Sequence, residues 1–392
     1  MSAAESAFTL QPAGYDDLPG WGEDDPSPLF SALGACRRHV REVKPYRAGT
    51  LGLTTEDLLP LLDAAATAAP GNAAEARAFF ESRCTPFRIC RDGGQRGFVT
   101  AFYEPEIQVS ATPGGEWRFP FYRRPDDLID LDAGNRPDFL DASYAFGRMQ
   151  DGRIGAYPDR GEIDRGYLDG RGLEIAWAKS KVDVFFAHVQ GAARLRYPDG
   201  SLKRITFAAK AGHPFSPIGR LLIDRGEIDP AKISMQAIRG WLAGHPDQVD
   251  EVLWHNRSYI FFKEAEVEDE TLGPVAAAKV PLVAGRSLAV DRFIHTFGFP
   301  FYISAPDITH LDKGAPFHRL MLAMETGTAI IGPARGDIFT GSGDEAGEQA
   351  GTVRHAADFY ILIPNGAAGR FGSQQFQQKR EAVLRPELRQ NG

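Results

Sequence analysis

The sequence has few cysteines and no metal-ligand spacing. Its 392 residues include only Cys36, Cys84 and Cys90, and an odd number cannot all be paired within one chain. A single Cys84–Cys90 bridge is one alternative, but we favour free buried thiols. The nine histidines show no H-E-x-x-H pattern. We therefore expect neither a metal nor another cofactor.

Long hydrophobic runs are missing as well. No apolar stretch reaches the roughly 18 residues that a membrane-spanning helix needs, and so we expect none. Residues 1–5 do not show the charged segment followed by an apolar core that is typical of a signal peptide. Two interpretations follow: the protein stays inside the cell, or a leader is missing from the sequence.

A positive charge excess is the third absence. The formal net charge is −8, which argues against nucleic acid as a partner because phosphate binding needs a basic surface. Apolar residues make up 43% of the chain, the composition of an ordinary soluble globular protein. The length predicts two or three domains and a large core.

The first hundred residues favour helices followed by a strand. Apolar spacing predicts a helix over 31–43, a second capped by Thr54 or Thr55, and a third capped by Asn72. Aromatic and β-branched residues then predict a strand over 97–105, which the proline at its end would stop.

Alternating apolar residues predict an antiparallel hairpin in the middle of the chain, with arms at 193–197 and 202–207. Residues 181–189 are ambiguous between helix and strand. The acidic stretch 264–273 is expected to be an exposed linker.

The last third is rich in short apolar runs separated by Gly, Pro and Asp. Such spacing predicts a small β-barrel, which leaves no sheet edge open. The runs are residues 288–290, 301–303, 320–324, 329–331 and 359–363.

Asp337 follows the fourth of these runs, within a stretch rich in Ala, Ile and Gly. Its close apolar neighbours predict a partly buried carboxyl at the edge of a strand. Burial raises a carboxyl pKa, which suits a general acid. Taken alone, a plain turn aspartate outweighs a catalytic one by about three to one, because Asp-Gly-rich turns are common.

Fragments spread over most of the chain carry a more specific signal together than any does alone. The fragments are DLPGW at 17–21, FVTAFYEP at 98–105, VQG at 189–191 with the DG turn at 199–200, GRLLIDRGE at 219–227, SMQAI at 234–238, YIFF at 259–262, LAVDR at 288–292, and GTAIIGPARGDIFTGSG at 327–343. With these fragments in this order and spacing, the chain resembles, over roughly residues 18–365, the lytic transglycosylases of the MltA type, the murein-degrading transglycosylases A.

The resemblance implies a mainly β fold with helical decoration, of the α+β class. It implies a double-psi β-barrel domain with N-terminal helices, built from residues 1–104 and 265–392. A smaller β-barrel-like domain would be inserted at 105–264, with a substrate groove between the two. The proline at 105 and the acidic stretch near 264 agree with these boundaries.

The resemblance also implies the chemistry, because the catalytic aspartate of the family falls on Asp337. It would cleave the β-1,4 bond between MurNAc and GlcNAc of peptidoglycan without water. One carboxyl would protonate the glycosidic oxygen and then accept the proton of the C6 hydroxyl, which attacks C1 and gives 1,6-anhydroMurNAc. The family often has Asp-x-Gly-Gly-Ala-Ile-Lys-Gly before this aspartate. Glu325, Thr328 and Ile331 depart from that pattern, and their effect on activity is left open.

Seven residues in family-like motifs are candidates for substrate binding, since sugars need neutral polar partners and rings on which to stack. They are Thr100, Tyr103, Gln190, Lys210, Ser234, Gln236 and Phe261. Strand packing is an equal alternative for Tyr103, and so is a solvated charge for Lys210. Burial in the core is the alternative for Phe261 or its neighbour. We expect Asp291 and Arg292 to form a structural ion pair.

The resemblance further implies peptidoglycan glycan strands as the partner of a monomer. The expected location is periplasmic or associated with the outer membrane, with links to that membrane or to the wall-synthesis machinery. Two other functions stay open. A double-psi barrel can bind glycans without catalysis, since fold does not fix function. A true hydrolase would need a second carboxylate near Asp337, and Asp344 and Glu345 follow a Gly-Ser-Gly turn that can carry them away.

Overall fold

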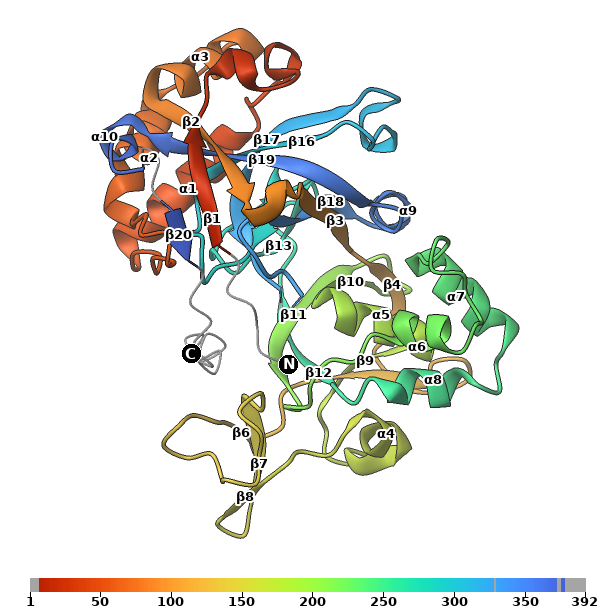
Figure 1. Ribbon diagram of the computed structural model, residues 1–392. Coiled ribbons are helices and arrows are strands. Elements are labelled where there is room, and N and C mark those ends of the chain that lie inside the picture. Colours follow the sequence, from red (N-terminus) through yellow and green to blue (C-terminus); the bar gives the residue numbers. More distant parts are fainter. Residues whose placement is uncertain (1–6, 328, 372–374, 378–392) are drawn as a thin grey trace. The chain divides into compact units, whose positions relative to one another are not determined.

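A computed structural model of the chain (Figure 1) describes residues 7–327, 329–371 and 375–377. These residues form two compact units. The first contains the chain up to Tyr103 and from Asp269 onward, and the second contains Glu104–Glu268. The domain boundaries given above, and the groove expected between the domains, stay predictions. Thr328, one of the departures from the family pattern, lies outside the described residues.

A closed six-stranded β-barrel forms the core of the first unit. Its strand order is β16-β17-β15-β18-β3-β19, and β19 pairs back to β16. β15 runs parallel to β17 and antiparallel to β18. The strands are β3 (Gly97–Glu104), β15 (Ser287–Val290), β16 (Pro300–Ala305), β17 (Phe317–Glu325), β18 (Arg335–Ser342) and β19 (Arg354–Pro364).

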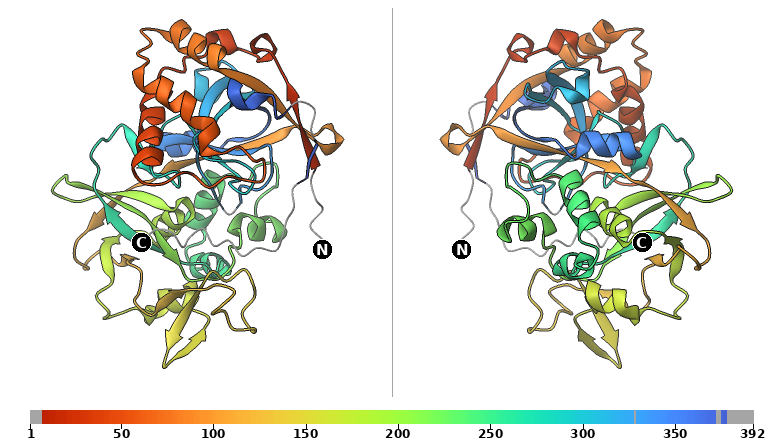
Figure 2. Two further views of the ribbon diagram at one scale, coloured as in Figure 1. Left: turned by 90° about the vertical axis from the view of Figure 1, so that its left-hand side faces the viewer. Right: turned by 90° about the vertical axis from the view of Figure 1, so that its right-hand side faces the viewer.

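Continuous apolar runs produce the barrel strands. All six residues of β16 are buried, and so are residues 320–324 of β17. Such runs are typical of strands covered on both faces. The helices α1 (Leu29–Glu42), α2 (Thr55–Thr67) and α3 (Ala73–Arg83) gather on one side of this unit, beside β2 (Cys84–Arg91) (Figures 1 and 2).

Local capping chemistry sets where these helices begin, as predicted. Thr54 precedes α2 and accepts the backbone N–H of Asp57, whose carboxylate accepts the N–H of Thr54 in return. Asn72 caps α3 through the N–H of Glu75, at 3.0 Å. The three cysteines are free, and Cys36 and Cys84 are buried.

Further short elements complete the first unit. β2 pairs with β19 and extends the sheet to β1 and then to β20. The elements are β1 (Ala7–Pro12), β20 (Gln375–Gln377), β13 (Leu272–Val275), β14 (Pro281–Val283), α9 (Asp344–Ala350), α10 (Asn365–Ala368), and the 3₁₀ turns at Tyr15–Asp17, Trp21–Glu23, Asp92–Gly94 and His310–Asp312.

One predicted barrel strand is wrong. The run 329–331 is not a strand, and Ile330 instead donates its N–H to the carbonyl of Gly327 in a turn. The apolar run is short, and Gly332, with φ of 118°, and Pro333 end it at once. The strand therefore begins later, at β18, and Asp337 lies inside that strand rather than after it.

The second unit is also built on six strands, in the order β12-β11-β10-β4-β9-β5. A bridge between Arg123 and Phe262 brings the two edges of this sheet together, which gives a barrel-like form. β10 and β11 form the predicted antiparallel hairpin. The ambiguous residues 181–189 are helical, because Ser180 caps α5 through the N–H of Asp183. The predicted mainly β fold with helical decoration is confirmed.

The remaining bounds of the second unit are as follows. The six strands are β4 (Glu106–Ser110), β5 (Phe119–Tyr122), β9 (Glu174–Ala178), β10 (Ala192–Arg196), β11 (Leu202–Lys210) and β12 (Ile260–Ala265). A small separate sheet contains β6 (Leu128–Asp130), β7 (Phe146–Gln150) and β8 (Arg153–Gly155). The helices are α4 (Arg160–Glu162), a π-helical turn at Ile163–Tyr167, α5 (Lys181–Gln190), α6 (Ile218–Asp224), α7 (Met235–Gly244) and α8 (Val249–His255).

A buried ion pair ties the N-terminal segment to the barrel. Both carboxylate oxygens of Asp24 accept from the guanidinium of Arg286, at 2.7 and 3.0 Å. Asp24 also accepts the backbone N–H of Leu320, at 2.8 Å. Asp24 and Arg286 are both buried, so removal of one partner leaves an uncompensated charge inside the protein.

We predict that Asp24→Ala lowers the free energy of unfolding by about 3–5 kcal/mol, because Arg286 stays buried without its carboxylate. The matched control is Asp25→Ala. The Asp25 carboxylate is exposed and, among the described residues, forms its hydrogen bonds with Ser27, so it should contribute less than about 1 kcal/mol. Urea denaturation of the two variants measures both values. Equal losses would show that the Asp24–Arg286 pair does not anchor the segment.

Candidate active site

Asp337 lies on β18, between β15 and β3, in the wall of the barrel. It pairs with Ala289 of β15, while β3 on the other side brings Thr100. The hydroxyl of Thr100 donates to Oδ1 of Asp337. Nη2 of Arg335 donates to the same hydroxyl oxygen at 2.8 Å. The carboxyl is therefore held by a short chain of hydrogen bonds that begins at a guanidinium.

Burial dominates the electrostatics of this carboxyl. It raises the pKa of Asp337 to about 6, against the opposing effects of the Thr100 hydrogen bond and the Arg335 charge. Its neighbours Gly336, Ile338 and Phe339 are buried, whereas Asp337 itself keeps partial solvent exposure. The group can thus be protonated in mildly acidic solution and remain within reach of a substrate, which are the two requirements of a general acid.

The segment before β18 is fixed by buried polar groups. One oxygen of Asp291 accepts the N–H of Gly332 at 2.8 Å, and the other accepts a second backbone N–H at 3.1 Å. Nε2 of His295 donates to the carbonyl of Pro333, at 2.8 Å. These two backbone groups engage both oxygens of the carboxylate, and the ion pair expected between Asp291 and Arg292 stays a prediction. Asp291 thus positions the chain that carries Arg335.

The far end of β18 is packed just as closely. The hydroxyl of Thr340 lies 3.1 Å from the carbonyl oxygen of Phe102 and 2.9 Å from that of Ala346. The ring of Tyr103 lies against Gly347 of α9, where an added Cβ would come within 2.7 Å of the ring. Tyr103 is buried, a position that favours the packing role over direct sugar contact.

Glu325 is a second perturbed carboxyl in the same barrel. Ala289 pairs with Glu325 on one side and with Asp337 on the other. Burial raises the pKa of Glu325 to about 7. Its two oxygens accept the backbone N–H groups of Thr326 at 2.8 Å and Ala277 at 3.0 Å. Sequence reasoning noted this residue only as a departure from the family pattern.

The other substrate-binding candidates belong to the second unit. Gln190 ends α5 and Lys210 ends β11, and both are half-buried. Ser234 caps α7 by accepting the N–H of Ala237 at 3.0 Å, and Gln236 is exposed in the first turn. Phe261 is fully buried, 5.8 Å from the ring of Tyr157, which favours the core role weighed for it.

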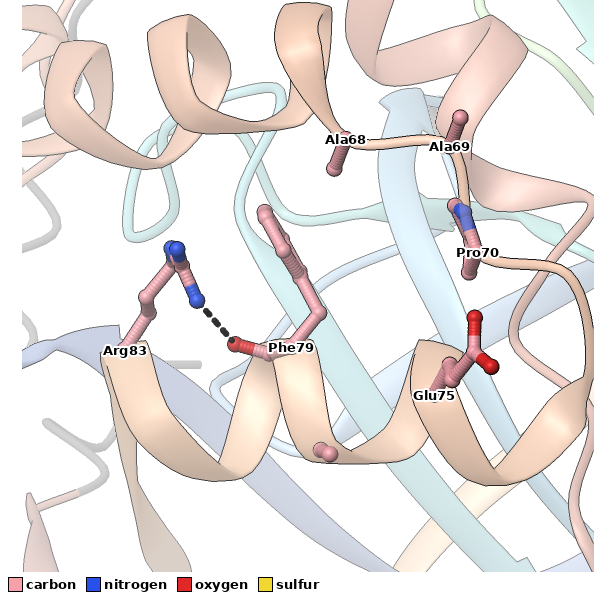
Figure 3. Close-up of a pocket in the computed structure, with 7 residues that line it drawn as sticks. Ala68, Ala69, Pro70, Glu75, Phe79 and Arg83 are labelled. Atoms are coloured by element: carbon pink, nitrogen blue, oxygen red, sulfur yellow. Dashed lines mark hydrogen bonds between the residues drawn. The ribbon is translucent and has the colours of Figure 1, made fainter.

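A cavity of about 350 Å³ in the first unit is not part of this site (Figure 3). It lies along α3 and the chain that precedes it. Arg83 donates to the carbonyl of Phe79, and Glu75 accepts the N–H of Gly71 at 2.8 Å. The charged side chains that line this cavity thus form hydrogen bonds with the backbone of α3 and of the residues just before it. In the described part of the chain, no cluster of His, Cys, Asp and Glu could hold a metal ion.

We predict that Thr100→Val raises the pKa of Asp337 above about 6, by roughly half to one unit, because the ionised carboxylate loses a hydrogen bond. Carbon-detected NMR titration of the carboxyl measures it. The control is Thr340→Val, whose hydroxyl bonds backbone carbonyls and should leave this pKa unchanged. An unaltered titration in Thr100→Val would contradict the role of the hydroxyl.

Two family models match the chain. The model of the MltA specific insert domain matches residues 98–263, and that of the 3D domain matches residues 286–363. Among the helices of the described residues, none has the length and apolar character to cross a membrane.

Solved structures resemble the chain over nearly its whole length. The membrane-bound lytic murein transglycosylase from Agrobacterium tumefaciens is 63% identical, with a TM-score of 0.87, and the match covers 93% of this chain and 99% of that one. MltA from Neisseria gonorrhoeae is 30% identical with a TM-score of 0.76, over 92% and 93%. Escherichia coli MltA with bound chitohexaose is 27% identical with a TM-score of 0.64, over 91% and 94%.

A curated relative agrees with these matches. The membrane-bound lytic murein transglycosylase A of Escherichia coli K12 is 34% identical over 278 residues, or 69% of this chain. The aligned part spans 66% of that relative, just under two thirds of its length. With a 63% identical relative matched over 99% of its length and both domain models present, the chain belongs to the membrane-bound lytic murein transglycosylase A family.

Proposed function

We propose that the chain cleaves the β-1,4 bond between MurNAc and GlcNAc of peptidoglycan without water and leaves 1,6-anhydroMurNAc ends. The observation that carries this proposal is the single carboxyl of Asp337, whose pKa is raised to about 6 and whose position is fixed by Thr100. The bound chitohexaose of the E. coli relative supports a glycan as the substrate.

The reaction needs one group that acts twice. Protonated Asp337 gives its proton to the glycosidic oxygen as positive charge develops at C1 of MurNAc. The C6 hydroxyl of the same sugar then attacks C1 and gives its proton to the carboxylate, so the C1–O6 bond replaces the glycosidic bond. The nucleophile is already part of the substrate, and the reaction gains the advantage of proximity. The reaction consumes no water and uses no nucleophile from the enzyme.

Glu325 does not supply the second carboxylate that a hydrolase requires. Both of its oxygens are engaged by backbone N–H groups, which leaves it poorly suited to activate a water molecule. The next acidic residues along the chain, Asp344 and Glu345, form the first turn of α9, and we do not assign them the role of the second carboxylate. A non-catalytic glycan-binding protein would have no need of a buried carboxyl with a raised pKa, and so we favour the lytic reaction over both alternatives.

Several finer statements belong to the same proposal. We assign the double-psi barrel domain to 1–104 with 265–392 and the inserted domain to 105–264, which the two compact units support. We further propose that Thr100 and the polar residues of the inserted domain contact glycan strands. The membrane-bound name of the relatives supports an envelope location for a monomer that meets the wall from the periplasmic side.

We predict that Asp337→Asn abolishes release of muropeptides from purified sacculi while binding to sacculi persists, because the amide cannot give or accept the proton. Mass spectrometry of the products identifies the reaction: anhydro-muropeptides support the proposal, and reducing ends would indicate hydrolysis. Asp344→Asn is the matched control, at the first residue of α9, and should keep full activity. Substantial release by Asp337→Asn would sink the single-acid mechanism.

The pH dependence follows from the same carboxyl. A raised pKa keeps Asp337 protonated below about 6, so kcat/KM should fall about tenfold per pH unit above that value. Thr100→Val should move this fall in kcat/KM to higher pH, since loss of the Thr100 hydroxyl raises the pKa of Asp337 further. Initial rates of sacculus solubilisation across the pH range measure the profile, and Asp344→Asn should share the wild-type curve. A flat profile through about pH 6 would be the contrary result.

A further inference from the structure

The second unit contains a cavity of about 510 Å³ that the proposed reaction does not use. It lies among β5, β9, the start of α5 and the segment 163–170. Four aromatic residues line it, namely Phe119, Tyr122, Trp177 and Tyr259. Three carboxylates, those of Asp164, Asp169 and Glu174, share the lining. Every lining residue belongs to the second unit.

Tyr259 lines this cavity. Its side chain is only 2% exposed, and its ring packs 4.4 Å from His188 and 5.1 Å from the guanidinium of Arg160. Within the described residues, its hydroxyl has no hydrogen-bond partner. Tyr259 shares the lining with Asp164 and Tyr122, so a ligand in the cavity can supply the hydrogen bond that this hydroxyl lacks.

Negative charge collects around the neighbouring tyrosine. Tyr122 is 3% exposed, and its ring lies 6.4 Å from that of Tyr259. Burial raises the pKa of Tyr122, followed by the charges of Asp169, Glu174 and Asp164. No basic residue is among these causes. Asp164 already accepts from Trp254 and lies 3.9 Å from Lys181. The hydroxyl of Tyr259, the aromatic walls and the carboxylates of Asp169 and Glu174 together favour a ligand with an ammonium group.

The lining also carries cationic groups. Arg118 lies over the ring of Phe119 at 5.5 Å, and Arg165 lies over Trp254 at 4.8 Å. Both are exposed, and neither forms an ion pair with any described residue. Lys181 also lines the cavity and is already engaged, 2.5 Å from Asp250 and 3.9 Å from Asp164. The two arginines offer guanidinium groups that fit a carboxylate, at a site whose other groups favour an ammonium.

We propose that this cavity binds a zwitterionic amino acid or peptide end, with its ammonium group at the carboxylates and the hydroxyl of Tyr259 and its carboxylate at Arg118 and Arg165. The diamino acids of peptidoglycan stems carry both groups. Only the choice of such a diamino acid as the ligand rests on the proposed function. The cavity then binds the peptide part of the wall, while Asp337 acts on the glycan.

The test uses meso-diaminopimelate as the probe on the full chain. Saturation-transfer NMR and calorimetry should show saturable binding that weakens as salt rises, because charged groups carry it. Pimelate lacks the ammonium groups, and cadaverine lacks the carboxylates. Each should bind at least about tenfold more weakly than the probe. N,N′-diacetylchitobiose tests whether the cavity takes a neutral sugar instead.

Two variants locate the binding. Tyr259→Phe keeps the ring and removes only the hydroxyl, and Asp169→Asn keeps the shape and removes a charge. Each should weaken the probe by roughly five- to tenfold. Tyr157→Phe is the matched control, since that buried hydroxyl donates to Asp127 at 3.0 Å and lies outside the cavity lining. It should bind the probe as the wild type does.

The contrary outcomes are equally specific. Absence of saturable binding, equal binding of pimelate or chitobiose, or equal losses in Tyr259→Phe and Tyr157→Phe would each overturn the assignment. Circular dichroism checks that the variants fold. Release of anhydro-muropeptides from sacculi is measured separately and depends on Asp337, so failure of the cavity proposal is distinguishable from failure of the proposed reaction.

Discussion

The strand order of the first barrel is the constraint on which the candidate active site depends. That order places β3 beside β18, and the pairing of β16 with β19 closes the ring. Because β3 and β18 are neighbours, the hydroxyl of Thr100 reaches a carboxyl 237 residues away in sequence. The backbone contacts of Asp291 and His295 fix the chain just before β18. The geometry of the acid is therefore a property of the whole ring rather than of the short motif around it.

The same enclosure sets the chemistry. The shift of Asp337 from 3.8 to about 6 corresponds to about 3 kcal/mol of free energy against the ionised form. Thr100 and Arg335 limit that shift by favouring the charge. This balance suits the proposed reaction, in which the group begins protonated and later accepts a proton. A more strongly raised pKa would make a poor donor, and an ordinary pKa would leave little acid near neutral pH. Glu325 carries a similar shift, yet its oxygens are committed to the backbone.

The sequence predicted the features that depend on residues a few positions apart. The caps Thr54 and Asn72 and the hairpin of β10 and β11 follow from spacing over a few residues. The run 329–331 was wrongly predicted as a strand because a short apolar segment shows no period that identifies its structure. The glycine and proline after it decide its conformation instead. The fixed position of Asp337 beside Thr100 depends on contacts far apart in the chain, which spacing cannot reveal; the family resemblance selected both residues. Burial of Phe261 could not be told from sugar stacking, because both roles favour an aromatic residue.

The interrupted first unit also dictates an order of assembly. Residues 104–268 are continuous and can fold as soon as they leave the ribosome, in line with domain-wise folding during synthesis. β3 must wait for partners made much later, because β18 and β19 lie beyond the second unit. Closing so long a loop is entropically costly and slow. A nascent chain that stops before β18 thus holds a finished second unit but lacks Asp337, so the cleavage proposed above requires nearly complete translation.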